Sequence, residues 1–414
     1  MDYIVSGGNR LCGKIAVYGA KNCALALLGA TVLTEEEIVL RNCPEIVDVE
    51  NMLSLLRAMG KSVVRSGDVV RVSGSLSTTS APRSLATLLR GSALILGSTV
   101  AKYNQIDLPL PGGCAIGARP MDIHLKGLET LGIEVANYDD GVSCRGVPKG
   151  ANYQLRFASV GATENLLCAC AIAKGKSVLA NCATEPEVVA LEQLLERMGA
   201  KIDGIGSSTV EIVGVETLHG AEFDVIPDRI VAATYLSATV ATQGDVTVTN
   251  CNPQHLKAFL DVLSLYFYIE QTHNALHIKA DAQPNGYGII TTAPYPYFPT
   301  DMQSLVLSLA AMSNGGRTVI VEKLFENRLN HNAYELNKMG ACVTVEADKA
   351  IVLGKKLHAA NVASHDLRGG AGLVIAALNA EGKSVVSGVE HINRGYVNLA
   401  ENLSTLGANI VTVK

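Results

Sequence analysis

The sequence predicts an α/β protein of two domains, each built from three similar helix-and-sheet repeats. A motif of the form Leu-x-x-Met/Leu-Gly-x-x-Val/Ile recurs along the 414 residues, with its glycine at positions 60, 132, 199, 340 and 407. A sixth, degenerate copy, called the worn copy below, has tyrosine in place of the glycine at position 266. The motif therefore returns about every 70 residues, which is typical of a chain built from repeated supersecondary units. Six copies of equal length favour two domains of three repeats.

Each repeat has the same predicted elements. The two apolar residues of the motif lie on one helical face, and the glycine follows at the position where a left-handed backbone ends a helix. Alternating apolar residues come next and predict strands at 341–345 and 408–413. A second alternating segment precedes the next repeat, as at 245–249 and 317–321. Each repeat therefore holds at least one helix with strands on both sides.

Composition excludes several classes of function. The net charge is −5, from 34 Lys+Arg and 39 Asp+Glu, with no basic run, no Trp and only 5% aromatic residues. These features argue against nucleic-acid binding. The longest uncharged stretches, 230–244 and 302–316, are too short and too polar to span a membrane. No signal peptide is visible, and the ten cysteines form no CxxC pair, so we expect a cytoplasmic protein without a metal site.

One loop is a candidate for chemistry. P-loop, dinucleotide-binding and serine-nucleophile fingerprints are missing. Residues 110–120 contain three glycines and two prolines around Cys114, which is unlike the settings of the other cysteines. A thiol in such a loop can act as an acid or a nucleophile if a cation such as Arg119 perturbs it. The alternative is an ordinary turn with a buried cysteine.

Isolated charges in apolar surroundings form a second candidate set. Bidentate guanidinium groups suit phosphate or carboxylate ligands, and together the cations favour a ligand with several negative charges. For each one alone, a structural salt bridge is the alternative. The cations are Lys21, Arg90, Arg328, Arg368 and Arg394.

A single carboxylate, Asp301, opens an uncharged segment. It is either a helix N-terminal charge or a general base. His124 lies in no metal-ligand spacing, so a metal role is disfavoured.

Several short motifs resemble the UDP-N-acetylglucosamine 1-carboxyvinyltransferase family of enolpyruvyl transferases, and the likeness runs from end to end. The motifs are 19–22 (GAKN), 111–120 (PGGCAIGARP), 159–163 (SVGAT), 185–187 (EPE), 227–229 (PDR), 298–303 (FPTDMQ), 325–328 (FENR) and 394–396 (RGY). The resemblance implies two inverse α/β barrels, one of residues 20–226 and one of residues 1–19 plus 227–414. It also implies an active site in the cleft between them.

The resemblance further implies a reaction without metal or organic cofactor. The enolpyruvyl group of phosphoenolpyruvate passes to the 3′-hydroxyl of UDP-N-acetylglucosamine, with phosphate release, by addition and then elimination. Cys114 would be the acid, would bond covalently to phosphoenolpyruvate and would be alkylated by the epoxide fosfomycin. Asp301 would be the base. The phosphoenolpyruvate ligands would be Lys21, Asn22, Arg119 and Arg394.

Other matched positions would contact the nucleotide sugar or complete the active site. The nucleotide-sugar set is Arg90, Arg119, Pro120, Met121, Asp122, Ile123, His124, Phe157, Ala158, Ser159, Val160, Gly161, Asp301 and Leu324. Further active-site positions are Arg328, Asp366 and Arg368. The expected partners are these two small molecules, with no nucleic acid and no membrane. The sequence leaves the oligomeric state open.

The chain departs from the family pattern at a few positions. Val47 and Phe157 stand where basic residues are common in the family, Ala26 replaces a proline, and 369–370 are both glycine. The loss of two cations favours, as one alternative, a non-catalytic paralogue that binds UDP-sugar and regulates the pathway. A second alternative is 5-enolpyruvylshikimate-3-phosphate synthase, which shares the fold and the chemistry.

Overall fold

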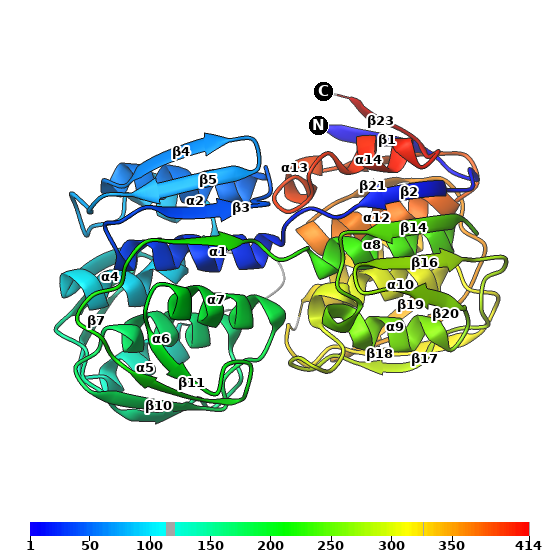
Figure 1. Ribbon diagram of the computed structural model, residues 1–414. Coiled ribbons are helices and arrows are strands. Elements are labelled where there is room, and N and C mark those ends of the chain that lie inside the picture. The colour runs from blue at the N-terminus through cyan, green and yellow to red at the C-terminus, as the bar shows by residue number, and fades with distance from the viewer. Residues whose placement is uncertain (113–120, 326, 414) are drawn as a thin grey trace. The chain divides into compact units, whose positions relative to one another are not determined.

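The computed structural model describes residues 1–112, 121–325 and 327–413, which form two compact units (Figure 1). We call residues 19–112 with 121–226 the first unit, and residues 1–18 with 227–325 and 327–413 the second unit. The chain thus starts in the second unit, builds the whole first unit, and returns.

The elements of the first unit follow one another in a regular alternation. They are α1 (Lys21–Ala30), η1 (Thr31–Leu33), β3 (Ile38–Arg41), α2 (Val47–Met59), β4 (Ser62–Ser66), β5 (Val69–Ser73), α3 (Arg83–Ala86), η2 (Arg90–Leu94), α4 (Ile95–Tyr103), β6 (Gln105–Pro109), α5 (Asp122–Thr130), β7 (Glu134–Tyr138), β8 (Gly141–Arg145), β9 (Asn152–Gln154), α6 (Val160–Ala171), β10 (Lys176–Ala180), α7 (Pro186–Arg197), β11 (Lys201–Asp203), β12 (Thr209–Val213) and β13 (Ala221–Asp224).

The second unit has the same alternation, with its first two strands at the N-terminus. Its elements are β1 (Asp2–Ser6), β2 (Cys12–Ala16), α8 (Arg229–Ala241), β14 (Asp245–Thr249), η3 (Pro253–Leu256), α9 (Lys257–Ser264), β15 (Ile269–Gln271), β16 (Ala275–Lys279), β17 (Gly288–Thr291), η4 (Thr300–Met302), α10 (Gln303–Ala311), β18 (Arg317–Val321), α11 (Arg328–Lys338), β19 (Cys342–Glu346), β20 (Lys349–Leu353), β21 (Asn361–Ala363), α12 (Leu367–Asn379), β22 (Lys383–Ser387), α13 (Val389–Ile392), α14 (Leu399–Thr405) and β23 (Asn409–Val413).

The sheets share one plan. An edge strand pairs in parallel with its neighbour, and the next two pairings are antiparallel, in the orders β13-β3-β5-β4, β9-β10-β12-β11, β2-β14-β16-β15, β17-β18-β20-β19 and β21-β22-β1-β23. The sheet β6-β8-β7 has a parallel bridge between Ser80 and Asp107 in place of the edge strand. Each unit is closed by a strand from its far end: β13 pairs with β3, and β1 pairs with β22 and β23.

Buried helices fill the interior of each unit. All residues of α8 and α10 are buried, whereas strands such as β14 alternate between buried and partly exposed residues. The sheets therefore face solvent on one side and cover helices on the other, which is the inverse α/β barrel arrangement. Close approach between helices requires small residues: a Cβ on Gly97 of α4 would lie 2.0 Å from the backbone oxygen of Asn165 in α6.

The predicted repeat is confirmed. The motif glycines 60, 132, 199, 340 and 407 follow helices and have φ values of 117°, 82°, 100°, 85° and 103°. A strand comes directly after each of them, and the strands predicted at 245–249 and 317–321 are β14 and β18. The backbone at Tyr266 of the worn copy does not enter the left-handed region, which a bulky residue adopts only at a cost.

The two long uncharged stretches of the sequence correspond to α8 and α10 with their flanking turns. Within the parts of the chain described above, none of the helices has the length and apolarity that crossing a membrane requires.

Candidate active site

The predicted site residues gather where buried helices begin. In the first unit, Lys21 is the first residue of α1, Arg90 opens the turn that leads into α4, and Ser159 caps α6. In the second unit, Asp301 lies in the turn before α10, and Asp366 caps α12. The N-terminal end of a helix carries partial positive charge and unpaired N–H groups, so such ends favour anionic ligands.

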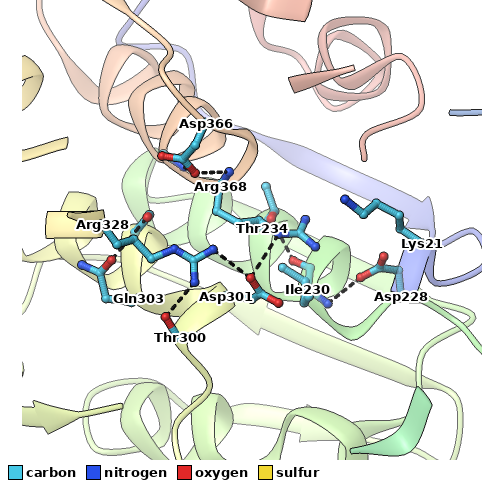
Figure 2. A network of polar contacts seen from close by, with 12 residues as sticks. Lys21, Asp228, Ile230, Thr234, Thr300, Asp301, Gln303, Arg328, Asp366 and Arg368 are labelled. Carbon is cyan, nitrogen blue, oxygen red and sulfur yellow. Dashed lines mark hydrogen bonds and ion pairs between the residues drawn. The ribbon is translucent and has the colours of Figure 1, made fainter. Parts of the chain in front are cut away.

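A network of charges surrounds Asp301 in the second unit (Figure 2). One guanidinium nitrogen of Arg328 donates a 2.9 Å hydrogen bond to Oδ1 of Asp301, and another donates a 2.7 Å bond to the Thr300 hydroxyl. Nε of Arg368 lies 3.9 Å from the same Oδ1. Both arginines are buried, with 3% side-chain exposure, while the Asp301 side chain is 29% exposed. The two buried arginines thus orient the carboxylate through Oδ1, while part of the Asp301 side chain stays accessible to solvent.

Aspartates cap the two helices that flank this network. Asp228 accepts hydrogen bonds from the backbone of Ile230 (2.8 Å) and Val231 at the start of α8 (Figure 2). Asp366 does the same for Arg368 (2.9 Å) and Gly369 at the start of α12. These caps fix the first turn of each helix and with it the backbone that carries the Arg368 side chain.

A buried tyrosine adjoins Arg368. The guanidinium carbon of Arg368 lies 5.6 Å from the ring centre of Tyr396, and the Tyr396 hydroxyl is 2.8 Å from that of Thr234 in α8. Burial raises the pKa of Tyr396, and the Arg368 guanidinium acts in the opposite direction. Arg394 is half-buried in the turn after α13, two residues from this tyrosine.

Close packing explains why residues 369 and 370 are glycine. A Cβ on Gly369 would lie 2.3 Å from the Asn332 side-chain oxygen, and one on Gly370 would lie 2.2 Å from the Ser364 hydroxyl. An alanine or a serine at either position would clash with these polar neighbours unless they moved.

Lys21 is paired in the first unit. Its ammonium donates a 2.8 Å hydrogen bond to the Asp48 carboxylate in the first turn of α2. The side chains are 13% and 4% exposed, so Asp48 is nearly inaccessible. This ion pair holds the Lys21 ammonium group in one position at the start of α1. Asn22 follows it at the half-buried start of α1, and Ala26, on the same helix, is buried.

His124 is a neutral, oriented hydrogen-bond donor. The side-chain oxygen of Asn165 accepts from Gly97 N (2.6 Å), so its amide nitrogen must be the group 3.0 Å from Nδ1 of His124. An amide nitrogen only donates, so Nδ1 accepts and Nε2 carries the proton. Burial, followed by the charge of Arg90, lowers the pKa of His124 to about 4.

A cavity of about 640 Å³ lies in the first unit beside these residues. Its lining includes predicted positions Arg90, Met121, Asp122 and Ile123. It also includes Arg156, which sequence reasoning missed and which forms an ion pair with Asp122. This ion pair places a guanidinium group on the cavity wall one residue before Phe157.

The remaining nucleotide-sugar positions lie in both units. Phe157 is 42% exposed and, like Val47 (45% exposed), offers no positive charge. The segment 158–161 is half-buried at the start of α6, and Leu324 is half-buried after β18. Cys114, Arg119 and Pro120 lie outside the described residues. In the described part of the chain, no three His, Cys, Asp or Glu side chains are placed to hold a metal ion.

Several contributors to these networks were not singled out from the sequence: Asp48, Arg156, Thr234, Thr300 and Tyr396. Asp228 had a readable signal, because a Pro-Asp-Arg triplet before an uncharged run is typical of a capped helix start. Asp48 and Arg156 had none, because nothing near them in the sequence indicates their partners.

Known proteins match the whole chain. The family described as EPSP synthase (3-phosphoshikimate 1-carboxyvinyltransferase) matches residues 5–403. UDP-N-acetylglucosamine 1-carboxyvinyltransferase 2 of Caldanaerobacter subterraneus is 40% identical over 413 residues, which cover 99% of both chains. The UDP-N-acetylglucosamine 1-carboxyvinyltransferase of Magnetococcus marinus is 43% identical over 417 residues, again 99% of both.

Solved structures agree on the fold. The enolpyruvyl transferase NikO from Streptomyces tendae has a TM-score of 0.89 at 23% identity, covering 99% of this chain and 98% of that one. An EPSP synthase from Acinetobacter baumannii has a TM-score of 0.76 at 19% identity over 99% of both chains. These neighbours have the predicted two-domain inverse α/β barrel fold. With full-length relatives at 40% identity or more, the chain belongs to the enolpyruvyl transferase family, an enzyme family, and within it to the UDP-N-acetylglucosamine 1-carboxyvinyltransferases.

Proposed function

We propose that this enzyme transfers the enolpyruvyl group of phosphoenolpyruvate to the 3′-hydroxyl of UDP-N-acetylglucosamine and releases phosphate. The observation that carries the proposal is the 43% identity, over 99% of both chains, to a relative of that name. The solved EPSP synthases are much more distant, at 19% identity. The proposal places the enzyme at the first committed step of peptidoglycan synthesis, and in the cytoplasm, where both substrates are made.

The chemistry needs a base and an acid. Asp301, held from behind by two buried arginines, takes the proton of the sugar hydroxyl as its oxygen bonds to C2 of phosphoenolpyruvate. Cys114 gives a proton to C3, and a tetrahedral ketal forms. The Cys114 thiolate then takes a proton back from C3, the C2–O bond to phosphate breaks, and the enol ether is left on the sugar. The set of groups requires no metal or organic cofactor.

Cations neutralise the anionic substrates in this proposal. Lys21, Asn22, Arg119 and Arg394 bind the phosphate and carboxylate of phosphoenolpyruvate. Arg368 and Asp366 complete the site around Asp301. The ordered pairing of Lys21 with Asp48 supports its role, because a fixed ammonium group loses less freedom when it binds an anion.

The remaining predicted site residues bind the nucleotide sugar in this proposal. Arg90 and the segment 119–124 bind it together with 157–161 and Leu324. The cavity beside Arg90, Asp122 and Ile123 supports this assignment for the first unit. The Nε2–H group of His124 offers a donor whose direction Asn165 fixes.

Product analysis tests the proposal. Purified protein is incubated with both substrates, and the product is examined by mass spectrometry and by carbon–proton NMR correlation. We expect a vinyl ether on the 3′-oxygen of the sugar. Cys114→Ser should greatly slow its formation while nucleotide-sugar binding stays measurable by calorimetry. Bound nucleotide sugar without any product from the wild type would instead favour a regulatory paralogue.

A further inference from the structure

One buried carboxylate joins the loops around Asp301. Glu322 directly follows β18, and Thr292 directly follows the parallel neighbour β17, so the carboxyl ends of two strands bring them together. Oε1 of Glu322 accepts from the Thr292 hydroxyl (3.0 Å) and from the backbone of Leu324 (2.8 Å). It also accepts from the backbone of Phe325 (3.2 Å). The residue is 3% exposed.

The other carboxylate oxygen leads toward Asp301. Oε2 of Glu322 accepts a 2.7 Å hydrogen bond from the Thr300 hydroxyl, and that hydroxyl accepts a 2.7 Å bond from Arg328. A hydroxyl has one proton, so donating it to Glu322 turns the lone pairs of Thr300 toward the guanidinium group. Arg328 then donates to Asp301 (Figure 2). Negative and positive groups alternate along this chain, so each contact favours the next.

Arg328 depends on this connection. It is buried, and across the described residues its Nε has no hydrogen-bond partner. Its guanidinium group is therefore oriented by the bonds to Thr300 and Asp301 and by the Phe325 ring 5.3 Å away. Without its bond to Thr300, the guanidinium group would keep, among the described residues, only its hydrogen bond to the carboxylate that it positions.

We propose that Glu322 is a positioning residue for the reaction: through Thr300 and Arg328 it fixes the direction of the Asp301 carboxylate, and through the Leu324 backbone it fixes the adjoining sugar-binding loop. The inference rests on the proposed role of Asp301 as base. Glu322 itself touches no substrate, since hydrogen bonds from the protein engage both of its oxygens.

A matched pair of threonines provides the test. Thr300 and Thr292 both donate to Glu322, but only Thr300 contacts Arg328. We expect Thr300→Val to lower kcat roughly tenfold or more, the loss typical of a hydrogen bond to a charged group, with both KM values within about threefold of the wild type. Thr292→Val should keep kcat within about threefold of the wild type, because it leaves the bond to Arg328 in place. Equal kcat values for the two variants would overturn the inference.

A double variant and a structure complete the test. Glu322→Gln with Thr300→Val should cost little more in kcat than the larger single loss, since both interrupt one path. Fully additive losses would contradict a shared path. The crystal structure of Thr300→Val gives a readout that does not depend on activity. We expect the Arg328–Asp301 separation to exceed about 3.5 Å. An unchanged contact would overturn the inference even if the wild type transfers no enolpyruvyl group, a result that by itself would refute only the proposed function.

Discussion

Replacing Arg328 with Met removes the stronger of the two charges that hold Asp301. At an effective dielectric constant of about 20, unit charges 2.9 and 3.9 Å apart attract by about 5.7 and 4.3 kcal/mol. Of these two attractions, Arg328 supplies somewhat more than half. Asp301 is 29% exposed, so water screens both contributions. The realistic loss is about 2 kcal/mol, similar to one charge-assisted hydrogen bond.

This loss corresponds to a fall in kcat of roughly 30-fold. We expect it in steady-state phosphate release at saturating nucleotide sugar, with the KM for phosphoenolpyruvate changed little. Arg328→Lys should recover only part of kcat, because one ammonium group does not reproduce the planar fork that reaches both Thr300 and Asp301. Arg317→Met is the matched control: Arg317 is exposed at the start of β18 in the same unit. A folded Arg328→Met variant with kcat within threefold of the control would refute the reasoning.

Three further predictions concern the first unit. Lys21→Met should lower the free energy of unfolding by about 3 kcal/mol, because it deprives the 4%-exposed Asp48 carboxylate of its ammonium partner, and adding Asp48→Asn should restore part of the loss in urea unfolding. His124 stays neutral in the folded protein down to about pH 4, whereas the unfolded chain takes up the proton near pH 6.5. Stability should therefore fall by about 2 kcal/mol between pH 7.5 and pH 5, and His124→Gln should remove that part of the slope; equal slopes would contradict it. Gly97→Ala should lower the free energy of unfolding by about 3 kcal/mol, because the new Cβ would lie 2.0 Å from the Asn165 backbone oxygen. The melting temperature should fall accordingly, and an unchanged melting temperature would be inconsistent with this packing.

The architecture was readable because its signals are local. A glycine directly after two apolar residues that are three positions apart predicts a helix end, and five motif glycines have the left-handed backbone that this predicts. Uncharged runs ahead of these motifs are the buried helices α8 and α10. The pairing of β13 with β3 and of β1 with β22, which closes each unit, joins residues far apart in the chain. No local sequence pattern predicts these pairings.

The sequence predicted many residues of the candidate site but not the hydrogen bonds and ion pairs between them. Lone charges at Lys21, Arg90 and Asp301 were visible because they interrupt or border uncharged sequence. Their partners depend on long-range contacts: 27 residues separate Lys21 from Asp48, and 27 separate Asp301 from Arg328. At Arg328 the structure shows the salt-bridge alternative, because the guanidinium group pairs with the carboxylate that we propose as the base.

The lost cation at Phe157 has a structural counterpart. Arg156 is the preceding residue, lines the cavity and pairs with Asp122. Phe157 itself does not line this cavity. The cavity wall therefore carries a guanidinium group although residue 157 is uncharged.

The choice of acceptor distinguishes the proposed reaction from its alternatives. Phosphate release from phosphoenolpyruvate is measured with the purified full-length chain in the presence of either UDP-N-acetylglucosamine or shikimate 3-phosphate. The account predicts release with the nucleotide sugar only. Release with shikimate 3-phosphate, or no release with either acceptor, would contradict it.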